Sequence, residues 1–461
     1  MRKSFFRIAA TLFLTAAVAW PGFAAARGKA DFTRFVAIGD SYGAAIEAGS
    51  LNEQHQVFSW PAIVARQAGA PDFQQPLVSY PGIGPELKLR DAVSYPPVIT
   101  AEPGQGQPLN LNLARPYNNL SIPGATVEDV ITVTGRENPP VGTAQQFAQF
   151  ILRGLGTEVQ QAVAQQPTFI AIWIGGNNAL GAVLNGSTNF LDTTANFTAA
   201  YNKMLDDLVA GAPNAGMVVG NLPTHVAVAP YASAVPPVII NPATRTPVLI
   251  NGAPVSYIYD AGNGQVAQLP AGSFVTLGAS ALLAQGYGIP PAFKAIPPFN
   301  LLPKVGTPLP DAVVLTPTEV TAIEARLVEF NAAIASAAAA RNIPVADISG
   351  LFDRVQNRSE FVGPFSFTSD FVTGGFFSLD GFHLTDIGYT LFADEFIKAI
   401  NQGYDAKIPA ASIADFLQNN GAMLGFGEAI DAQLSAEAIS QIRSFAPLAM
   451  QPAPRFRGVH H

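Results

Sequence analysis

Short, uninterrupted apolar runs are the feature that most constrains how this chain can fold. Residues 35–38, 169–174 and 217–222 are runs of this kind, and a weaker run at 343–348 is interrupted by a proline and an aspartate. A strand that is covered on one face alternates apolar and polar residues, whereas a parallel strand buried on both faces is apolar throughout. The runs therefore predict strands of a parallel sheet with both faces covered.

Helical patterns lie between the apolar runs. Residues 158–166 lead into the second predicted strand, and residues 316–319 form a capping box that opens a helix running to about Ala340. A further helix is predicted after Thr385. This alternation of strands and helices indicates an α/β fold, in which helices cover a central parallel sheet.

One long segment interrupts the alternation. Residues 225–318 hold 15 of the 38 prolines and only five charged residues, together with apolar runs that a free linker would not carry. We therefore expect an insertion packed on the core of one domain that spans residues 32–401. Residues 402–461 are expected to form a tail of two or three short helices, with Ser412 and Ser435 as N-caps.

The first 26 residues have the pattern of a secretory signal peptide. Arg2, Lys3 and Arg7 form a positive start, residues 8–20 carry no charge, and small residues at 24–26 offer a cleavage site. The alternative is a membrane anchor, but the apolar run is shorter than the ~20 residues that span a bilayer. We expect an exported protein, periplasmic or extracellular if the source is bacterial.

Composition excludes several classes of function. Without the first 26 residues, the chain carries 22 Lys and Arg against 33 Asp and Glu. Nucleic-acid binding needs clustered positive charge, so we expect no nucleic-acid partner. The absence of Cys excludes a disulfide framework, a thiolate metal site and a cysteine nucleophile. Because no acidic cluster has EF-hand spacing, we expect neither a metal nor another cofactor.

The residues after the first predicted strand are Gly39-Asp40-Ser41-Tyr42-Gly43, a literal match to the G-x-S-x-G elbow of α/β-hydrolases. The position of the motif argues against that fold, in which several strands precede the elbow. A serine at the carboxyl end of a parallel strand still lies where open α/β sheets place their active sites. The alternative is an ordinary strand-to-helix turn with a capping serine.

A serine nucleophile needs a base, because a neutral hydroxyl attacks poorly. Of the five histidines, His383 has the best context, since it precedes a predicted helix and follows Asp380 by three residues. Such a turn can bring the carboxylate to one ring nitrogen and leave the other nitrogen for Ser41. The alternative is a helix cap or a solvated loop. His55 lies in a polar loop, and His225 has no acidic residue near it in the sequence.

Two glycine-containing turns can supply hydrogen-bond donors for an oxyanion. Gly124 follows a proline in a tight turn, where the missing side chain lets a backbone N–H approach the substrate. Asn177 follows two glycines at the end of the second buried strand and offers an amide. Each donor of this kind contributes roughly 10²–10³ in rate. Taken alone, each segment is equally compatible with a plain turn.

Together and in this order, the four blocks resemble those of the SGNH hydrolase family, also called GDSL esterases and lipases. The resemblance covers the predicted domain except its insertion. It implies a flavodoxin-like three-layer α/β/α sandwich, with Ser41 as the nucleophile and His383 as the general base and then acid. It further implies that Asp380 orients His383, and that the N–H groups of Ser41 and Gly124 and the side chain of Asn177 form the oxyanion hole.

Two residues depart from the common pattern of that family. Tyr42 stands where leucine is common, and Asn178 stands where aspartate is common. Neither belongs to the implied triad, so the departures put the surroundings of Asn178, but not catalysis, in doubt.

The residues around these blocks favour an apolar substrate. Eight phenylalanines lie between Gly350 and His383, and Phe376 and Phe377 adjoin the implied catalytic loop. Phenylalanine belongs to the core by default, but the apolar insertion can also wall an acyl pocket or act as a lid. We predict a carboxylic-ester hydrolase that acts on medium- or long-chain acyl esters and contacts a lipid surface peripherally. The alternatives are a sugar O-acetylesterase or O-acetyltransferase, and a catalytically inactive lipid-binding or surface interaction protein.

Overall fold

The computed structural model describes residues 29–91, 98–136, 144–262, 264–362 and 365–411. The predicted signal segment lies outside these ranges, and so do the tail helices expected at Ser412 and Ser435. Within these ranges, no helix has both the length and the hydropathy that a membrane crossing requires.

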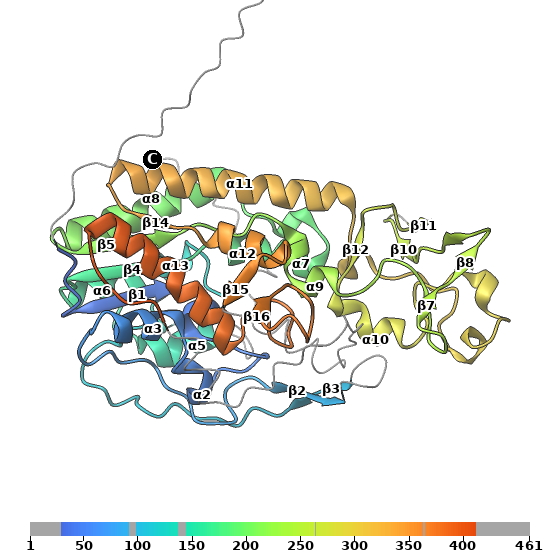
Figure 1. The fold of residues 1–461 in the computed structure, drawn as a ribbon, viewed down its shortest axis with the longest axis horizontal. Helices are drawn as coiled ribbons and strands as arrows, with labels where there is room; N and C mark the ends of the chain where they lie inside the picture. The colour runs from blue at the N-terminus through green and yellow to red at the C-terminus, as the bar shows by residue number, and fades with distance from the viewer. Residues whose placement is uncertain (1–28, 92–97, 137–143, 263, 363–364, 412–461) are drawn as a thin grey trace, which may run out of the picture.

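A four-stranded parallel sheet forms the centre of the domain (Figure 1). Its strands are β1 (Phe35–Gly39), β4 (Phe169–Trp173), β5 (Gly216–Gly220) and β14 (Val345–Ala346), in the order β1-β4-β5-β14. Every residue of β1 and β4 is buried, as strands covered on both faces require. The structure confirms the four predicted strands. The last is short because Asp347, directly after it, already caps the next helix.

Residues 118–122 extend the sheet beyond β1, a strand-like segment that the sequence did not reveal. The Ala37 N–H donates to the Asn118 carbonyl oxygen at 2.8 Å, and the Ile122 N–H donates to the Gly39 carbonyl oxygen at 3.0 Å. The pairing is parallel. Counted along the chain, the sheet order becomes 2-1-3-4-5, which is the flavodoxin-like order.

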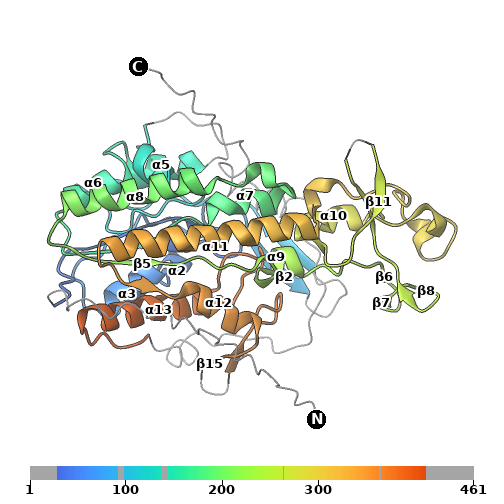
Figure 2. The same cartoon turned by 90° about the horizontal axis from the view of Figure 1, so that it is seen from above.

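Helices cover both faces of this sheet (Figure 2). On one face, α6 (Glu158–Ala164) packs on β1, and α8 (Thr194–Gly211) contacts both α6 and α11 (Pro317–Ala340). On the other face, α13 (Asp386–Tyr404) packs on β5 and β14 and against α3 (Trp60–Gln67). These layers confirm the predicted α/β/α sandwich.

The predicted helix starts are present at the expected residues. The Thr316 N–H donates to the Glu319 carboxylate at 2.8 Å, and the Glu319 N–H donates back to the Thr316 hydroxyl at 3.4 Å. At the start of α13, the Thr385 hydroxyl accepts a hydrogen bond from the Gly388 N–H at 3.0 Å. Both caps satisfy N–H groups that have no partner within the helix.

Smaller elements complete the main domain. Its other helices are α1 (Ser41–Ala44), α2 (Glu53–Gln56), α4 (Asp129–Thr132), α5 (Ala144–Leu152), α7 (Asn177–Asn185) and α12 (Ile348–Gln356). Two antiparallel pairs are formed by β2 (Glu86–Asp91) with β3 (Val98–Glu102) and by β15 (Glu360–Val362) with β16 (Phe365–Phe367). A single 3₁₀ turn lies at Thr188–Phe190 in the main domain, and residues 225–318 hold five more, at Val226–Val228, Leu277–Ala279, Pro291–Phe293, Phe299–Leu301 and Asp311–Val313.

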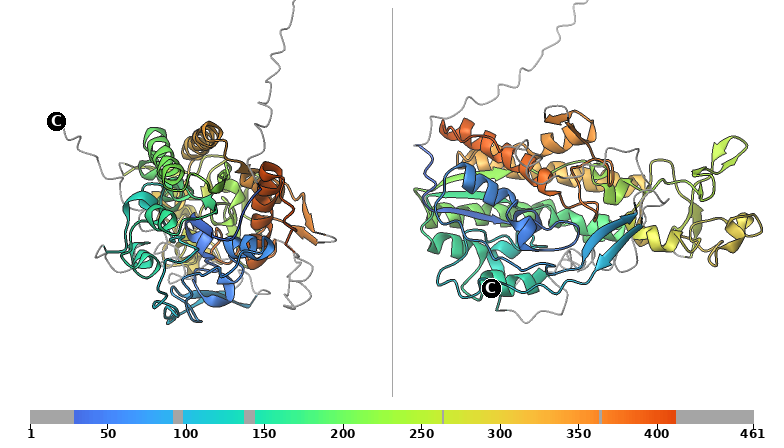
Figure 3. Two further views of the ribbon diagram at one scale, coloured as in Figure 1. Left: turned by 90° about the vertical axis from the view of Figure 1, so that its left-hand side faces the viewer. Right: turned by 60° about the horizontal axis from the view of Figure 1, so that its bottom comes forward.

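Residues 225–318 form a lobe that extends beyond one end of the sheet (Figures 1 and 3). Its helices are α9 (Pro230–Ser233) and α10 (Ser280–Leu283). Its strand pairs are β6 (Ile240–Asn241) with β7 (Thr246–Pro247), β8 (Leu249–Ile250) with β9 (Ala253–Pro254), β10 (Ile258–Asp260) with β11 (Val266–Gln268), and β12 (Phe274–Val275) with β13 (Val314–Leu315).

The lobe packs around a second apolar cluster, which it shares with main-domain residues such as Leu87, Leu184 and Phe382. Tyr257, Val275 and Leu309 are buried in this second cluster, whereas only a few lobe residues, such as Val226 and Leu315, join the main core. The insertion thus joins the main cluster near its two ends and packs against other parts of the main domain through the second cluster. The apolar runs of the insertion contribute Ile239 and Phe299 to this shared second cluster.

Candidate active site

Ser41 lies at the carboxyl end of β1, where the sequence predicted it. Asp40 caps the one-turn helix α1, and its Oδ1 accepts a hydrogen bond from the Tyr42 N–H at 3.0 Å. Gly43 packs so closely on the neighbouring segment that a Cβ there would lie 2.1 Å from Ser121 Oγ. The second glycine of the motif thus serves close packing of α1, which explains the G-x-S-x-G match on a different fold.

Asp380 and His383 form the pair that their spacing predicted. The His383 Nδ1 lies 2.8 Å from Asp380 Oδ2, and both side chains are buried. Backbone N–H groups of Phe382 and His383 donate to the other oxygen, Oδ1, at 3.1 Å and 2.8 Å, and the Gly49 N–H donates to Oδ2 at 3.0 Å. The carboxylate is therefore fixed by the turn and by a loop that follows α1.

The pKa of Asp380 is lowered despite its burial. Burial by itself raises the pKa, but the charge of His383 and the hydrogen bonds from His383 and Phe382 outweigh it. An ionised Asp380 holds a hydrogen on Nδ1, which leaves Nε2 of His383 as the nitrogen able to take a proton. The buried Nε2 has no hydrogen-bond partner among the described residues.

Tyr42 joins the Ser41 turn to the His383 turn. Its hydroxyl donates to the carbonyl oxygen of Phe382, and its ring centroid lies 5.9 Å from that of His383. The Tyr42 ring also stacks on Trp173, with centroids 4.7 Å apart. In the sequence, Tyr42 stood out only because leucine is common at its position. Its hydrogen bond to Phe382 could not be predicted, because the two residues are 340 positions apart.

Gly124 follows the strand-like segment 118–122 and so reaches the same sheet edge as Ser41. Its φ of +83° lies in the left-handed region that favours glycine. The hydrogen bonds within the described ranges include none donated by the backbone N–H of Ser41 or of Gly124. Both groups are thus free to donate to an oxyanion.

Asn177 is the first residue of α7 and is also buried at this edge. Its Nδ2 donates to the Ala125 carbonyl oxygen at 2.9 Å and to Asp40 Oδ2 at 3.3 Å. Both amide hydrogens therefore have protein acceptors. The longer bond, to Asp40, is the one that must yield if Asn177 is to donate to an oxyanion.

Burial raises the pKa of Asp40 to about 8, although the Tyr42 N–H lowers it in part. A proton on Asp40 at neutral pH removes a negative charge from beside Ser41. An oxyanion that develops near Asn177 would otherwise be repelled by that charge.

Asn178 has partners that explain why it is not an aspartate. Its Nδ2 donates to Asp192 Oδ2 at 3.0 Å, while its Oδ1 accepts from the Val127 N–H at 3.2 Å. A carboxylate at this position would face a second carboxylate. The two hydrogen bonds of Asn178 fix the loop after Gly124 to α7 and to Asp192.

A cavity of about 140 Å³ opens beside Ser41. Its walls come from β4, α7, the start of the lobe, α11 and α12, and they are almost wholly apolar. The lining includes Trp173, Leu180, Leu222, Phe352, Phe377 and Phe382. Three of the eight predicted phenylalanines thus reach the cavity, whereas Phe376 is fully buried in the main core.

Two other histidines have surroundings that the sequence did not predict. His225 lines the cavity and is half exposed, and its Nδ1 lies 3.7 Å from Glu324 of α11. His55 was expected in a polar loop but lies in α2 among carboxylates. Both sets of partners are distant in sequence.

One family model matches this chain, and two solved structures are similar to it. The family model described as GDSL-like Lipase/Acylhydrolase matches residues 35–396. No curated protein sequence matches the chain. A family 3 carbohydrate esterase from Clostridium thermocellum is similar in structure, at 12% identity over 81% of this chain and 98% of that chain, with a TM-score of 0.32. Phospholipase A1 from Streptomyces albidoflavus NA297 is similar at 15% identity over 79% of this chain and 98% of that one, with a TM-score of 0.34.

The family match covers well over half of the chain and contains all four sequence blocks. The chain therefore belongs to the GDSL-like lipase/acylhydrolase family of ester hydrolases, as the blocks predicted.

Proposed function

We propose that this protein is an exported carboxylic-ester hydrolase that cleaves medium- or long-chain acyl esters through Ser41, His383 and Asp380. The observation that carries the proposal is the apolar cavity beside Ser41. Its walls suit an acyl chain and offer few groups that could bind a sugar.

In the proposed reaction, His383 Nε2 takes the proton of the Ser41 hydroxyl as Oγ attacks the ester carbonyl carbon. The tetrahedral intermediate collapses, the ester C–O bond breaks, and His383 gives the proton to the leaving alkoxide. Water then attacks the acyl-enzyme by the same route and releases the carboxylic acid. Asp380 keeps the ring oriented and stabilises the imidazolium that forms.

The proposed oxyanion hole consists of the Ser41 and Gly124 N–H groups and the Asn177 amide. The two backbone donors need no rearrangement, because neither is engaged within the described ranges. Asn177 joins them when it releases Asp40. Removing one such donor costs roughly 10²–10³ in kcat in enzymes of this kind.

The volume of the cavity sets an expected chain length. An apolar cavity of about 150 Å³ binds benzene, so the cavity beside Ser41 has room for about six carbon atoms. Esters of six to eight carbons should therefore be hydrolysed better than acetate esters, and longer chains would extend past the cavity toward solvent.

A chain-length profile with p-nitrophenyl esters tests this proposal. We expect kcat/KM to rise from acetate to octanoate. Leu180→Trp, which narrows the cavity, should lower kcat/KM for octanoate by about tenfold while acetate changes little. Leu191→Trp, outside the cavity lining, is the matched control. A preference for acetate, with activity on acetylated polysaccharide, would contradict the proposal and indicate a sugar O-acetylesterase.

Export is part of the proposal and rests on the pattern of the first 26 residues. Expression with the full N-terminus should yield a secreted or periplasmic chain that begins at Arg27. N-terminal sequencing of that material checks the cleavage site. An intact N-terminus on cytoplasmic protein would contradict it.

Contact with a lipid surface is supported by exposed apolar side chains on the lobe. Leu249 and Ile250 of β8 are 57% and 52% exposed, and Leu301 is 80% exposed. Figure 1 shows β8 at the end of the lobe farthest from the sheet. Exposed apolar groups on a projecting element suit insertion into a lipid interface.

A further inference from the structure

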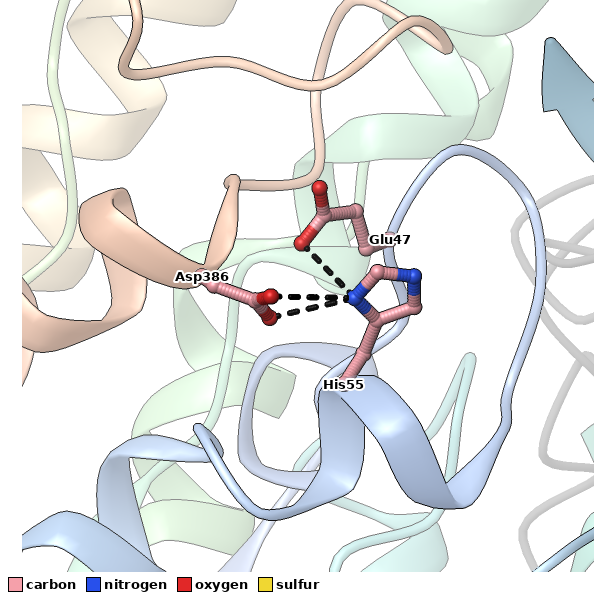
Figure 4. A group of neighbouring side chains, drawn as sticks. All are labelled: Glu47, His55 and Asp386. Carbon is pink, nitrogen blue, oxygen red and sulfur yellow. Dashed lines mark hydrogen bonds and ion pairs between the residues drawn. The ribbon is translucent and has the colours of Figure 1, made fainter. Parts of the chain in front are cut away.

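Glu47, His55 and Asp386 converge at a place apart from the proposed triad (Figure 4). The Nδ1 of His55 lies 3.1 Å from Asp386 Oδ1 and 3.2 Å from Glu47 Oε2. One atom from each residue can be chosen so that all three lie within 4.8 Å of one another. The residues come from the loop after α1, from α2 and from the first turn of α13, so that only the fold brings them together.

When all its carboxyl groups are ionised, the cluster holds more carboxylate oxygens than it has hydrogens to satisfy them. A ring nitrogen carries at most one hydrogen, and the Nδ1 hydrogen bond goes to Asp386. Glu47 Oε2 points at the same nitrogen, yet it is buried and accepts no hydrogen bond. Because a buried carboxylate without a donor is costly, the arrangement favours a further cation.

A second, independent observation lies on the other side of the ring. The Glu86 side chain is only 7% exposed, and its Oε1 lies 3.8 Å from His55 Nε2 and pairs with Lys88. Its Oε2 is buried and has no hydrogen-bond partner within the described ranges. Three carboxyl groups therefore surround one imidazole and one ammonium, and burial together with the charge of Glu47 raises the pKa of Asp386, one of the three, to about 8.

We propose that Glu47, His55 and Asp386 bind one divalent transition-metal ion of the Zn²⁺ or Mn²⁺ class. One imidazole and two carboxylates are a donor set that suits these ions, whereas Ca²⁺ takes oxygen ligands. Bonds of about 2.0–2.2 Å place neighbouring ligand atoms about 3.0–3.4 Å apart in octahedral or tetrahedral geometry. The separations at His55 Nδ1 agree with that spacing.

The ion would act as a structural clamp and would take no part in the reaction. Glu47 is followed by Ala48 and Gly49, whose N–H groups donate to Ser378 Oγ and Asp380 Oδ2, each at 3.0 Å. Asp386, on the other side, begins α13 three residues after the proposed base. The ion thus fastens together the two segments that hold the Asp380–His383 pair.

A proton is the competing occupant. Burial lowers the pKa of His55, but the charge of Glu47 and the hydrogen bonds to Asp386, Glu47 and Glu86 raise it to about 12. An imidazolium would then replace the metal ion as the cation of the cluster, and a binding experiment separates these two states.

Isothermal titration calorimetry on the mature protein tests the site directly, after dialysis against EDTA and then against metal-free buffer. ZnCl₂ and MnCl₂ are titrated separately at pH 7.5. We expect one ion per chain for at least one metal, and affinity about tenfold weaker or worse in Glu47→Gln and Asp386→Asn. Glu53→Gln, on the same helix as His55, is the matched control and should bind as the wild type does.

The thermal unfolding midpoint gives a second readout, because an ion that binds the folded state raises this midpoint. We expect a rise on adding the ion to the stripped wild type and to Glu53→Gln, and none in the Glu47→Gln/Asp386→Asn double variant. Two results would overturn the proposal. One is no stoichiometric binding and no rise for the wild type, which assigns the cluster to an imidazolium ion pair. The other is unchanged affinity in the double variant.

Discussion

Replacing Asp380 with asparagine tests the proposed role of this carboxylate against its hydrogen bonds. Asp380 Oδ2 faces the Gly49 N–H and His383 Nδ1, and Oδ1 accepts from the backbone N–H groups of Phe382 and His383 and from the Ser378 hydroxyl. Asparagine keeps the shape of the side chain but exchanges one acceptor oxygen for a donor NH₂ group. It therefore cannot accept all five hydrogen bonds.

The asparagine amide can adopt two orientations, with its NH₂ group at the position of either Oδ1 or Oδ2. At the position of Oδ1 it faces two backbone N–H groups, whereas at the position of Oδ2 it faces only the Gly49 N–H, because the His383 ring can change tautomer and accept at Nδ1. The orientation with NH₂ at the position of Oδ2 destabilises the folded state less, since each buried donor left unpaired costs about 1–3 kcal/mol. We expect the free energy of unfolding to fall by about that amount.

The same tautomer change puts the ring hydrogen on Nε2, so His383 can no longer take the proton of Ser41. We expect kcat to fall by about 10⁴, the size of effect seen when a triad aspartate becomes asparagine. Initial rates with p-nitrophenyl octanoate measure kcat, and urea denaturation measures stability. Asp353→Asn, on α12, is the matched control. A folded Asp380→Asn enzyme that keeps more than a tenth of wild-type kcat would refute the reasoning.

Three further outcomes are expected. Tyr42→Phe leaves the Phe382 carbonyl without its donor, so the free energy of unfolding measured in urea should fall by about 1–3 kcal/mol. The value of kcat should fall more than KM changes, and an unchanged kcat would contradict a positioning role for Tyr42. Folded Asp40 keeps its proton up to pH about 8, whereas the unfolded chain releases it near 4, so stability should fall with rising pH between these values, by about 1 kcal/mol per unit. Urea denaturation from pH 5 to 9 should show a smaller fall in Asp40→Asn, and equal slopes would argue against a raised pKa. The double variant Leu249→Ser/Leu301→Ser should bind phosphatidylglycerol vesicles more weakly in a sedimentation assay while cleaving soluble esters normally. Binding equal to that of the wild type would show that these two side chains do not contact the lipid surface.

Much of the main domain could be predicted because its signals are local. Uninterrupted apolar runs mark buried strands, and the Thr316 box and the Thr385 cap are complete within four residues. The Asp380–His383 pair belongs to the same class, since one turn holds both partners. The candidate residues Ser41 and Asn177 could be proposed for the same reason, since each follows a predicted strand.

The missed features all depend on partners distant in sequence. Residues 118–122 hold asparagine and serine among their five residues, so nothing in their pattern marks a buried sheet edge. The Tyr42 contact with Phe382 and the carboxylates around His55 likewise exist only once the chain has folded. The second apolar cluster, which the lobe and the main domain share, was missed because apolar composition indicates that a segment is buried but does not show which residues cover it.

The order of the elements also decides when the site can exist. Ser41 begins α1 just after β1, the first strand described, and His383 precedes the last helix described, α13, which packs on β5, β14 and α3. A nascent chain that ends before His383 has the serine, but it lacks both the proposed base and the helix α13, which packs on the sheet beside it. If the protein is exported as proposed and is unfolded during export, the hydrolase stays inactive inside the cell that makes it until folding is complete elsewhere.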